Sequence, residues 1–246
     1  MSIENAVEFL LFSYFGLNFD DKDKPERIID FAIKKAYKDA TMQGAYNALK
    51  KNINKDSSDG TSILKKEINL LVQEDYLMDY DSWHSDDENG VCKKLVDVYD
   101  KVKCPDSNNE NAFSYGNAQK WINMTIKYLH MLLELFGKYY PECNFCQKYK
   151  KLNDLYSYFH APVDSYIIES IWEDEEIRLP LIEDNLLKEG KRGKYCSEKV
   201  LAWSKWDKNE YDNFKNDLHK KVGCPIEWEH NAWIKTVKKR KEKERV

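Results

Sequence analysis

The sequence predicts an all-α fold, a multi-helix bundle around a central buried helix at about residues 115–137. The stretch from Tyr115 to Phe136 has the longest apolar pattern with helical spacing, and apolar side chains cover most of its circumference, as in helices buried among others. Glycine (9) and proline (6) are sparse among 246 residues, whereas sandwiches, barrels and long linkers need more turn residues. Hydrophobic residues make up 42% of the chain, which is sufficient for a core.

Capping residues and helical spacing predict the other elements. Ser2 can cap a first helix. Asp23 followed by Pro25 starts a long second helix, whose alanines would let another helix approach closely. The expected helices, besides the central one, are residues 3–15, 25–51, 63–72, 91–102, 147–158 and 166–172, with three helix-like segments between residue 197 and about residue 245.

The length allows one large domain or two smaller ones. We expect a single helical domain over residues 1–246, with a sub-lobe boundary near residues 173–196. An acidic run at residues 173–176 and a basic, glycine-containing loop at residues 187–194 mark this boundary, because composition changes there.

The polar residues of the central helix share one edge, since they follow one another at steps of three or four. One interpretation is that this edge is the solvated strip of a core helix. The other is a groove in which amide, ammonium and imidazole groups bind phosphate or carboxylate. Its binding residues would be Gln119, Lys120, Asn123 and Lys127, with His130 following on the same edge.

The start of the central helix is a second candidate for anion binding. Ser114 or Asn117 can cap it, and free backbone N–H groups would then lie at the positive end of the helix dipole.

Two turns place a proline, an aliphatic residue and an acid before a helical run, Pro162 to Asp164 and Pro225 to Glu227. The pattern is typical of a helix start with an acid in its first turn. It could also bring Asp164 or Glu227 to the polar edge as a partner for a lysine. In a catalytic site, His130 and Asp164 would support hydrolysis as acid and base, and whether the protein is an enzyme stays open.

Other motifs give weaker indications. Cys143 and Cys146 have the spacing of half a zinc site or of a redox pair, but matching partners are lacking, so both are interpreted as buried thiols. The acidic loop at residues 83–90 lacks the spacing of a calcium loop. We therefore expect no metal site. The sequence contains no phosphate loop, kinase motif or dinucleotide fingerprint, and we expect no cofactor.

Charge and hydropathy indicate a protein without membrane association. The formal net charge of the chain is −4. Residues 235–246 alone carry a net charge of +5, so the chain has a basic tail and an acidic remainder. No apolar run approaches the length needed to span a bilayer, and Glu4 and Glu8 lie where a signal peptide would be basic. Six cysteines are too few for a disulfide framework in a chain of this length. We expect a soluble, cytoplasmic protein with reduced cysteines.

The segment GNAQKWINMTIKYL resembles a set of uncharacterised bacterial and phage-borne helical proteins that share the pattern GxAQKxxNxxxKYL. Weaker echoes lie at residues 32–40, 160–164 and 225–233. The resemblance implies a shared helical architecture and a setting in phage–host conflict. The matching positions are Gly116, Ala118, Gln119, Lys120, Asn123, Lys127, Tyr128 and Leu129.

These observations favour a helical protein that binds an anionic ligand (nucleic acid, a nucleotide or another phosphate compound) in a groove on the central helix. The alternative is a non-catalytic interaction module that recognises a protein through its tryptophan-rich C-terminal third. Exposure of Trp228 or Trp233 would favour the alternative, and burial would weaken it. A homo-oligomer is a third hypothesis, which needs only an apolar patch.

Overall fold

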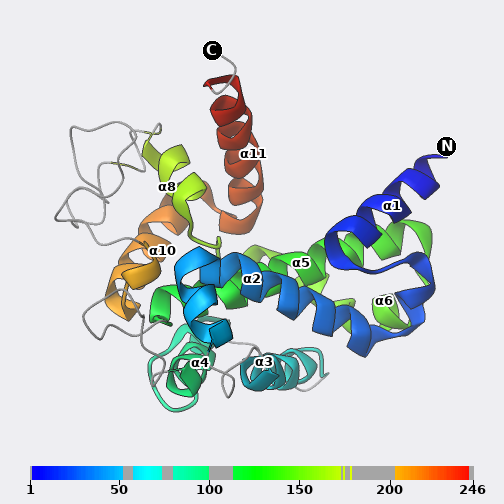
Figure 1. Ribbon diagram of the computed structural model, residues 1–246, viewed down its shortest axis with the longest axis horizontal. Helices are drawn as coiled ribbons and strands as arrows, with labels where there is room; N and C mark the ends of the chain where they lie inside the picture. Colours follow the sequence, from blue (N-terminus) through cyan, green and yellow to red (C-terminus); the bar gives the residue numbers. More distant parts are fainter. Residues whose placement is uncertain are drawn as a thin grey trace.

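A computed structural model of the chain describes residues 2–51, 58–73, 80–99, 113–172, 174, 178 and 203–243. All regular secondary structure in these ranges is helical, which confirms the predicted all-α class (Figure 1). The α-helices are α1 (Ile3–Phe15), α2 (Pro25–Lys51), α3 (Ser58–Leu71), α4 (Val91–Tyr99), α5 (Tyr115–Tyr139), α6 (Asn144–Tyr149), α7 (Lys151–Asp154), α8 (Ser165–Trp172), α10 (Lys208–Val222) and α11 (Pro225–Lys243). Four 3-10 turns join them: η1 (Phe19–Asp23), η2 (Tyr80–His84), η3 (Tyr156–Tyr158) and η4 (Trp203–Lys205).

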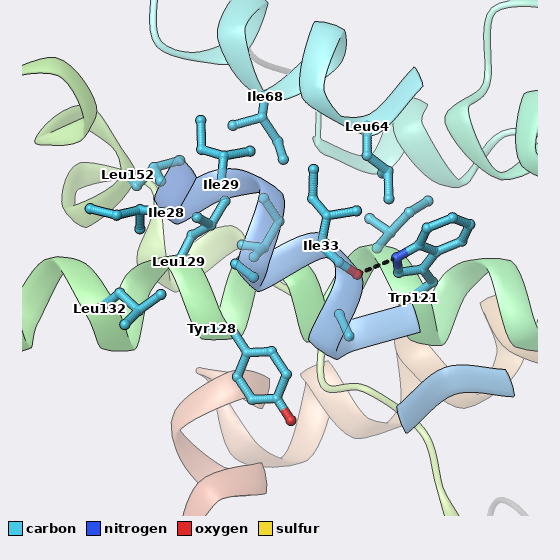
Figure 2. Close-up of a cluster of buried hydrophobic side chains, with 14 of the residues drawn as sticks. Ile28, Ile29, Ile33, Leu64, Ile68, Trp121, Tyr128, Leu129, Leu132 and Leu152 are labelled. Carbon is cyan, nitrogen blue, oxygen red and sulfur yellow. Dashed lines mark hydrogen bonds between the residues drawn. The ribbon is translucent and has the colours of Figure 1, made fainter. Parts of the chain in front are cut away.

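The larger core forms where α2 packs along α5, with α3 packed on α2 and α4 packed on α3 and α5 (Figure 1). Ala32, Ala36 and Ala40 of α2 are fully buried, as expected for small residues where another helix approaches closely. Trp121 fills the space between α2 and α5, and its Nε1 donates a hydrogen bond to the Ile33 carbonyl at 3.0 Å (Figure 2). Gly60 of α3 must be small, because a Cβ there would lie 2.4 Å from the Trp121 ring.

A second, smaller core joins α8, α10 and α11 with η4, and Tyr115 at the start of α5 packs on both cores. Gly116 allows this close approach. Its N–H donates to the Trp206 carbonyl at 3.0 Å, and a Cβ would lie 2.1 Å from the Trp203 carbonyl oxygen. The predicted sub-lobe boundary near residues 173–196 lies outside the described residues except for residues 174 and 178.

The predicted helix at residues 147–158 is instead three short pieces, α6, α7 and η3. The predicted helix at residues 91–102 is described to Tyr99 only. Over the ranges that the structure covers, no helix combines the length and the apolar character that crossing a bilayer requires.

Candidate ligand-binding site

A cavity of about 780 Å³ lies against the polar edge of α5. In Figure 1, α1 and α11 rise on the same side of α5. Both helices contribute residues to the walls of the cavity, together with α2 and α8. The lining residues are Tyr14, Lys38, Asp39, Lys120, Met124, Lys127, Tyr128, Met131, Asp164, Ser165, Tyr166, Glu229, His230, Trp233 and Ile234.

Lys120 and Asp164 form one of two ion pairs at this cavity. The Lys120 side chain is 5% exposed, and its Nζ lies 3.4 Å from Asp164 Oδ2 and 4.6 Å from the Trp203 ring centroid. Asp164 also accepts hydrogen bonds from the backbone N–H groups of Tyr166 and Ile167, so it caps α8. Both interpretations of the Pro162–Asp164 turn are therefore correct: it starts a helix, and it brings a carboxylate to a lysine of the central helix.

Lys127 and Glu229 form the second pair, with 2.5 Å between Lys127 Nζ and Glu229 Oε2. The Glu229 side chain is 2% exposed, and burial raises the pKa of its carboxyl group although the adjacent Lys127 ammonium lowers it. Asp164 raises and Lys120 lowers the same pKa, so all four side chains interact electrostatically. We call Lys120, Lys127, Asp164 and Glu229 the charged cluster.

The sequence pattern pointed to Glu227 rather than to Glu229. Glu227 is exposed in the first turn of α11, and Glu229, two residues further on, is the one that faces α5. Residues 226, 229, 232 and 236 of α11 are all buried, and their spacing of three or four places them on one inward face of the helix. This spacing is the signal that could have identified Glu229.

A chain of hydrogen bonds forms the wall on the side of α1 and α2. The Tyr14 and Tyr128 hydroxyls lie 2.8 Å apart, the Tyr128 hydroxyl donates to Asp39 at 2.5 Å, and Lys35 Nζ donates to the same Asp39 oxygen at 2.7 Å. Tyr128 is a buried member of the larger core, and its hydroxyl points away from the isoleucines (Figure 2). The Asp39 carboxylate thus already accepts hydrogen bonds from Tyr128 and Lys35.

Gln119 and Asn123 do not line this cavity. Asn123 uses its whole amide inside the protein: its Oδ1 accepts from the Tyr80 hydroxyl at 2.8 Å and from His84 Nε2 at 3.0 Å, and its Nδ2 donates to Gln119 at 3.1 Å and to the Tyr211 hydroxyl at 2.9 Å. The Gln119 side-chain amide donates to the Gly116 carbonyl. Both side chains are buried and hydrogen-bonded within the protein, which gives them a structural role, and their contact with a ligand stays a prediction of the sequence.

The interpretation of the polar edge as a solvated strip is wrong over its first half, since Gln119, Lys120 and Asn123 are all buried. Sequence periodicity showed that these residues share an edge. It did not show that α10 and the 80–84 turn cover it.

The hydrogen-bonded network of Asn123 continues to a second set of titratable groups, which the sequence did not reveal. The Tyr211 hydroxyl and His160 Nδ1 are hydrogen-bonded at 2.9 Å. His160 Nε2 lies 2.8 Å from an Asp81 oxygen, which also accepts from Lys215 at 2.8 Å. Burial lowers the pKa of His160, and the Asp81 hydrogen bond opposes this. The network connects the larger core to α10 of the smaller one.

His130 lies apart from the charged cluster. It lines a neighbouring cavity, and its ring stacks on Tyr156 with centroids 4.1 Å apart. Burial lowers the pKa of His130, while Glu134 raises it. Asp164 lines the first cavity instead, so a joint role of His130 and Asp164 in hydrolysis stays a prediction.

The start of α5 does not offer the free N–H groups that were expected for an anion. Ser114 caps the helix by accepting from the Asn117 N–H, and the Asn117 side chain accepts from the Ser114 N–H in return. The Gly116 N–H is bonded to the Trp206 carbonyl. The Gly116 and Asn117 N–H groups are therefore bonded within the protein and are not free for an anion.

Cys143 and Cys146 contact each other at the start of α6. The Cys143 sulfur caps α6 by accepting from the Cys146 N–H at 3.5 Å, and burial raises the pKa of the Cys146 thiol to about 12. In the acidic loop, Asp87 accepts from the N–H groups of Asn89 and Gly90. Within the described ranges, no three His, Cys, Asp or Glu side chains are grouped as metal ligands.

The tryptophans of the C-terminal third are mostly packed. Trp203 and Trp206 are buried, and Trp228 packs on the smaller core. Trp233 is 38% exposed, but it faces the cavity, with its ring centroid 5.7 Å from that of Tyr166. The most exposed large hydrophobic side chains are Ile3, Phe9, Leu10 and Phe12 on α1 and Tyr158 on η3.

Comparisons of the chain with models of protein families, with curated proteins and with solved structures find no match.

Proposed function

We propose that the protein binds a small organic anion, such as a nucleotide or another phosphate compound, in the cavity beside α5. The observation that carries the proposal is that two lysines of one helix, Lys120 with a 5% exposed side chain and Lys127 with a 14% exposed one, reach the same cavity. Buried ammonium groups are costly unless they are paired, and such groups at a cavity are typical of ligand sites. The volume of about 780 Å³ suits a molecule of nucleotide size.

The lysines can receive an anion while they keep their carboxylates. An ammonium group has three N–H donors, and the described contacts give each lysine one carboxylate partner. Oxygen atoms of a phosphate or carboxylate would accept from the remaining donors, and such charge-assisted hydrogen bonds are short and strong.

Two aromatic residues of the lining suit a planar apolar group. Trp233 and Tyr166 lie side by side on α11 and α8, and the Trp233 ring is accessible from the cavity. A nucleobase or another flat ring would stack on such side chains.

The charge balance favours a small anion over a nucleic acid. The lining contains Lys38, Lys120 and Lys127 against Asp39, Asp164 and Glu229, so its formal charges cancel. A long polyanion needs an uncompensated positive surface, which this lining lacks. The alternative of an interaction module in the C-terminal third keeps support from Trp233, which is 38% exposed, whereas Trp228 packs on the smaller core and Trp203 and Trp206 are buried. A setting in phage–host conflict stays a prediction of the sequence resemblance.

Isothermal titration calorimetry with adenosine monophosphate and with naphthalene-1-sulfonate tests the proposal. Both probes combine a flat ring with an anionic group. We expect Lys120→Met and Lys127→Met to weaken binding about tenfold or more, because each removes a charge-assisted hydrogen bond. Lys138→Met is the matched control, since Lys138 is exposed on the same helix and does not line this cavity.

Circular dichroism would establish that each variant is folded. Absence of binding of both probes to the parent protein would overturn the proposal, and so would unchanged affinity in both folded cavity variants.

A further inference from the structure

The charged cluster places a carboxylate that has almost no contact with water next to the expected position of the ligand. Glu229 is on the buried side of α11, and its only described polar partner is Lys127, at 2.5 Å. An anion that accepts from Lys127 would come close to this carboxylate, and the two negative charges would repel each other where water screens them little.

Resting on the function proposed above, we propose that Glu229 takes up a proton when an anion binds beside Lys127, so that the affinity for the anion rises as the pH falls. The proton comes from the solvent and forms an O–H bond with a Glu229 oxygen. The neutral carboxyl group no longer repels the anion, and Lys127 keeps its positive charge for the ligand.

The surroundings of Glu229 favour such uptake. The groups that face it are Lys120 and Lys127 from α5, Asp164 before α8, and Tyr156 from η3. In the free protein, burial and the Asp164 carboxylate raise the pKa of Glu229, while Lys127 and Lys120 lower it. The net effect is a raised pKa. A bound anion adds one more negative charge to this balance and raises that pKa further, which by linkage is proton uptake on binding.

His230 is the other group whose protonation would favour an anion. It follows Glu229 in the chain, is exposed and lines the cavity. The Glu229→Gln variant keeps His230 and keeps the titration of the ligand, so the difference between parent and variant isolates Glu229.

The experiment is calorimetry of the parent and Glu229→Gln with adenosine monophosphate and with naphthalene-1-sulfonate, near pH 6, in two buffers of different ionisation enthalpy. The slope of binding enthalpy against buffer ionisation enthalpy counts the protons taken up. We expect the parent to take up a larger fraction of a proton than Glu229→Gln. We also expect its affinity to rise about threefold or more from pH 8 to pH 6, with a smaller rise in the variant.

Glu227→Gln is the matched control, because Glu227 lies on the same helix, is exposed and does not line the cavity. It should behave as the parent does. Binding with equal proton uptake in parent and Glu229→Gln would overturn the inference and leave the proposed function standing. Absence of binding to the parent would overturn both.

If Glu229→Gln does not fold, a His230→Gln variant that keeps Glu229 decides. The sulfonate charge is constant over this pH range, so the parent in a His230→Gln background should still take up a proton with naphthalene-1-sulfonate. No uptake there would overturn the inference.

Discussion

The imidazole rings of His84 and His160 lie 4.4 Å apart, centroid to centroid, in the buried seam between the two cores. Burial lowers the pKa of His84 well below its usual range, and the neighbouring His160 lowers it further. Two imidazolium ions at this distance would repel each other without water between them. The seam is therefore built for neutral histidines.

We expect acid to weaken the fold through this pair. Both histidines have a folded-state pKa below the unfolded value of about 6.5, so the unfolded chain binds more protons as the pH falls below about 6.5. The free energy of unfolding is then constant above this pH and decreases below it. Urea unfolding between pH 8 and pH 5 measures the effect.

Histidine variants supply the control for that pH dependence. His160→Gln should reduce the loss between pH 6.5 and pH 5, whereas His219→Gln should not, because His219 is exposed. An identical decrease in all three proteins would contradict the assignment. The lowered pKa of Asp81 acts in a different window, since its contribution is lost only as the pH falls below about 4.

Gly116→Ala should destabilise the protein by about 2 kcal/mol or more, because the new Cβ would meet the Trp203 carbonyl oxygen. Gly137→Ala on the same helix is the control: nothing lies within 4 Å of its Cβ, and alanine is the better helix former by about 0.5–1 kcal/mol. Chemical denaturation of both variants should give opposite signs. Equal effects would show that η4 does not press on α5.

Asn123→Ala should lower the free energy of unfolding by about 3–5 kcal/mol, because the buried polar groups of Gln119, Tyr80 and Tyr211 would each lose a hydrogen bond. Asn231→Ala, at an exposed site on α11, should change the free energy of unfolding by less than about 0.5 kcal/mol. Urea midpoints compare the two. A small loss for Asn123→Ala would argue that the amide serves a ligand rather than the fold.

Lys127→Met should destabilise the protein at neutral pH, because it leaves the buried Glu229 carboxylate without its cation; breaking a buried pair costs about 3–5 kcal/mol. The double variant Lys127→Met/Glu229→Met should recover much of this loss, since no buried charge remains. A double-mutant cycle of unfolding free energies measures the coupling. Additive losses would contradict a direct interaction of the two side chains.

Local patterns predicted the elements well. Ser2 caps α1, Pro25 opens α2, and α5 runs from Tyr115 to Tyr139, close to the predicted 115–137. These features depend on neighbours within about four residues, so the linear sequence contains them. The edge shared by Lys120 and Lys127 is of the same kind, because helical spacing alone determines it.

The residues that contact this edge of α5 come from distant parts of the chain. Lys127 meets Glu229 across 102 positions of the chain, and Asn123 meets Tyr80 and Tyr211 across 43 and 88. Sequence by itself determined which polar groups line up along α5. Only the tertiary structure decided that Asn123 is covered and that Lys127 opens to a cavity, because burial depends on which distant helices pack against each turn.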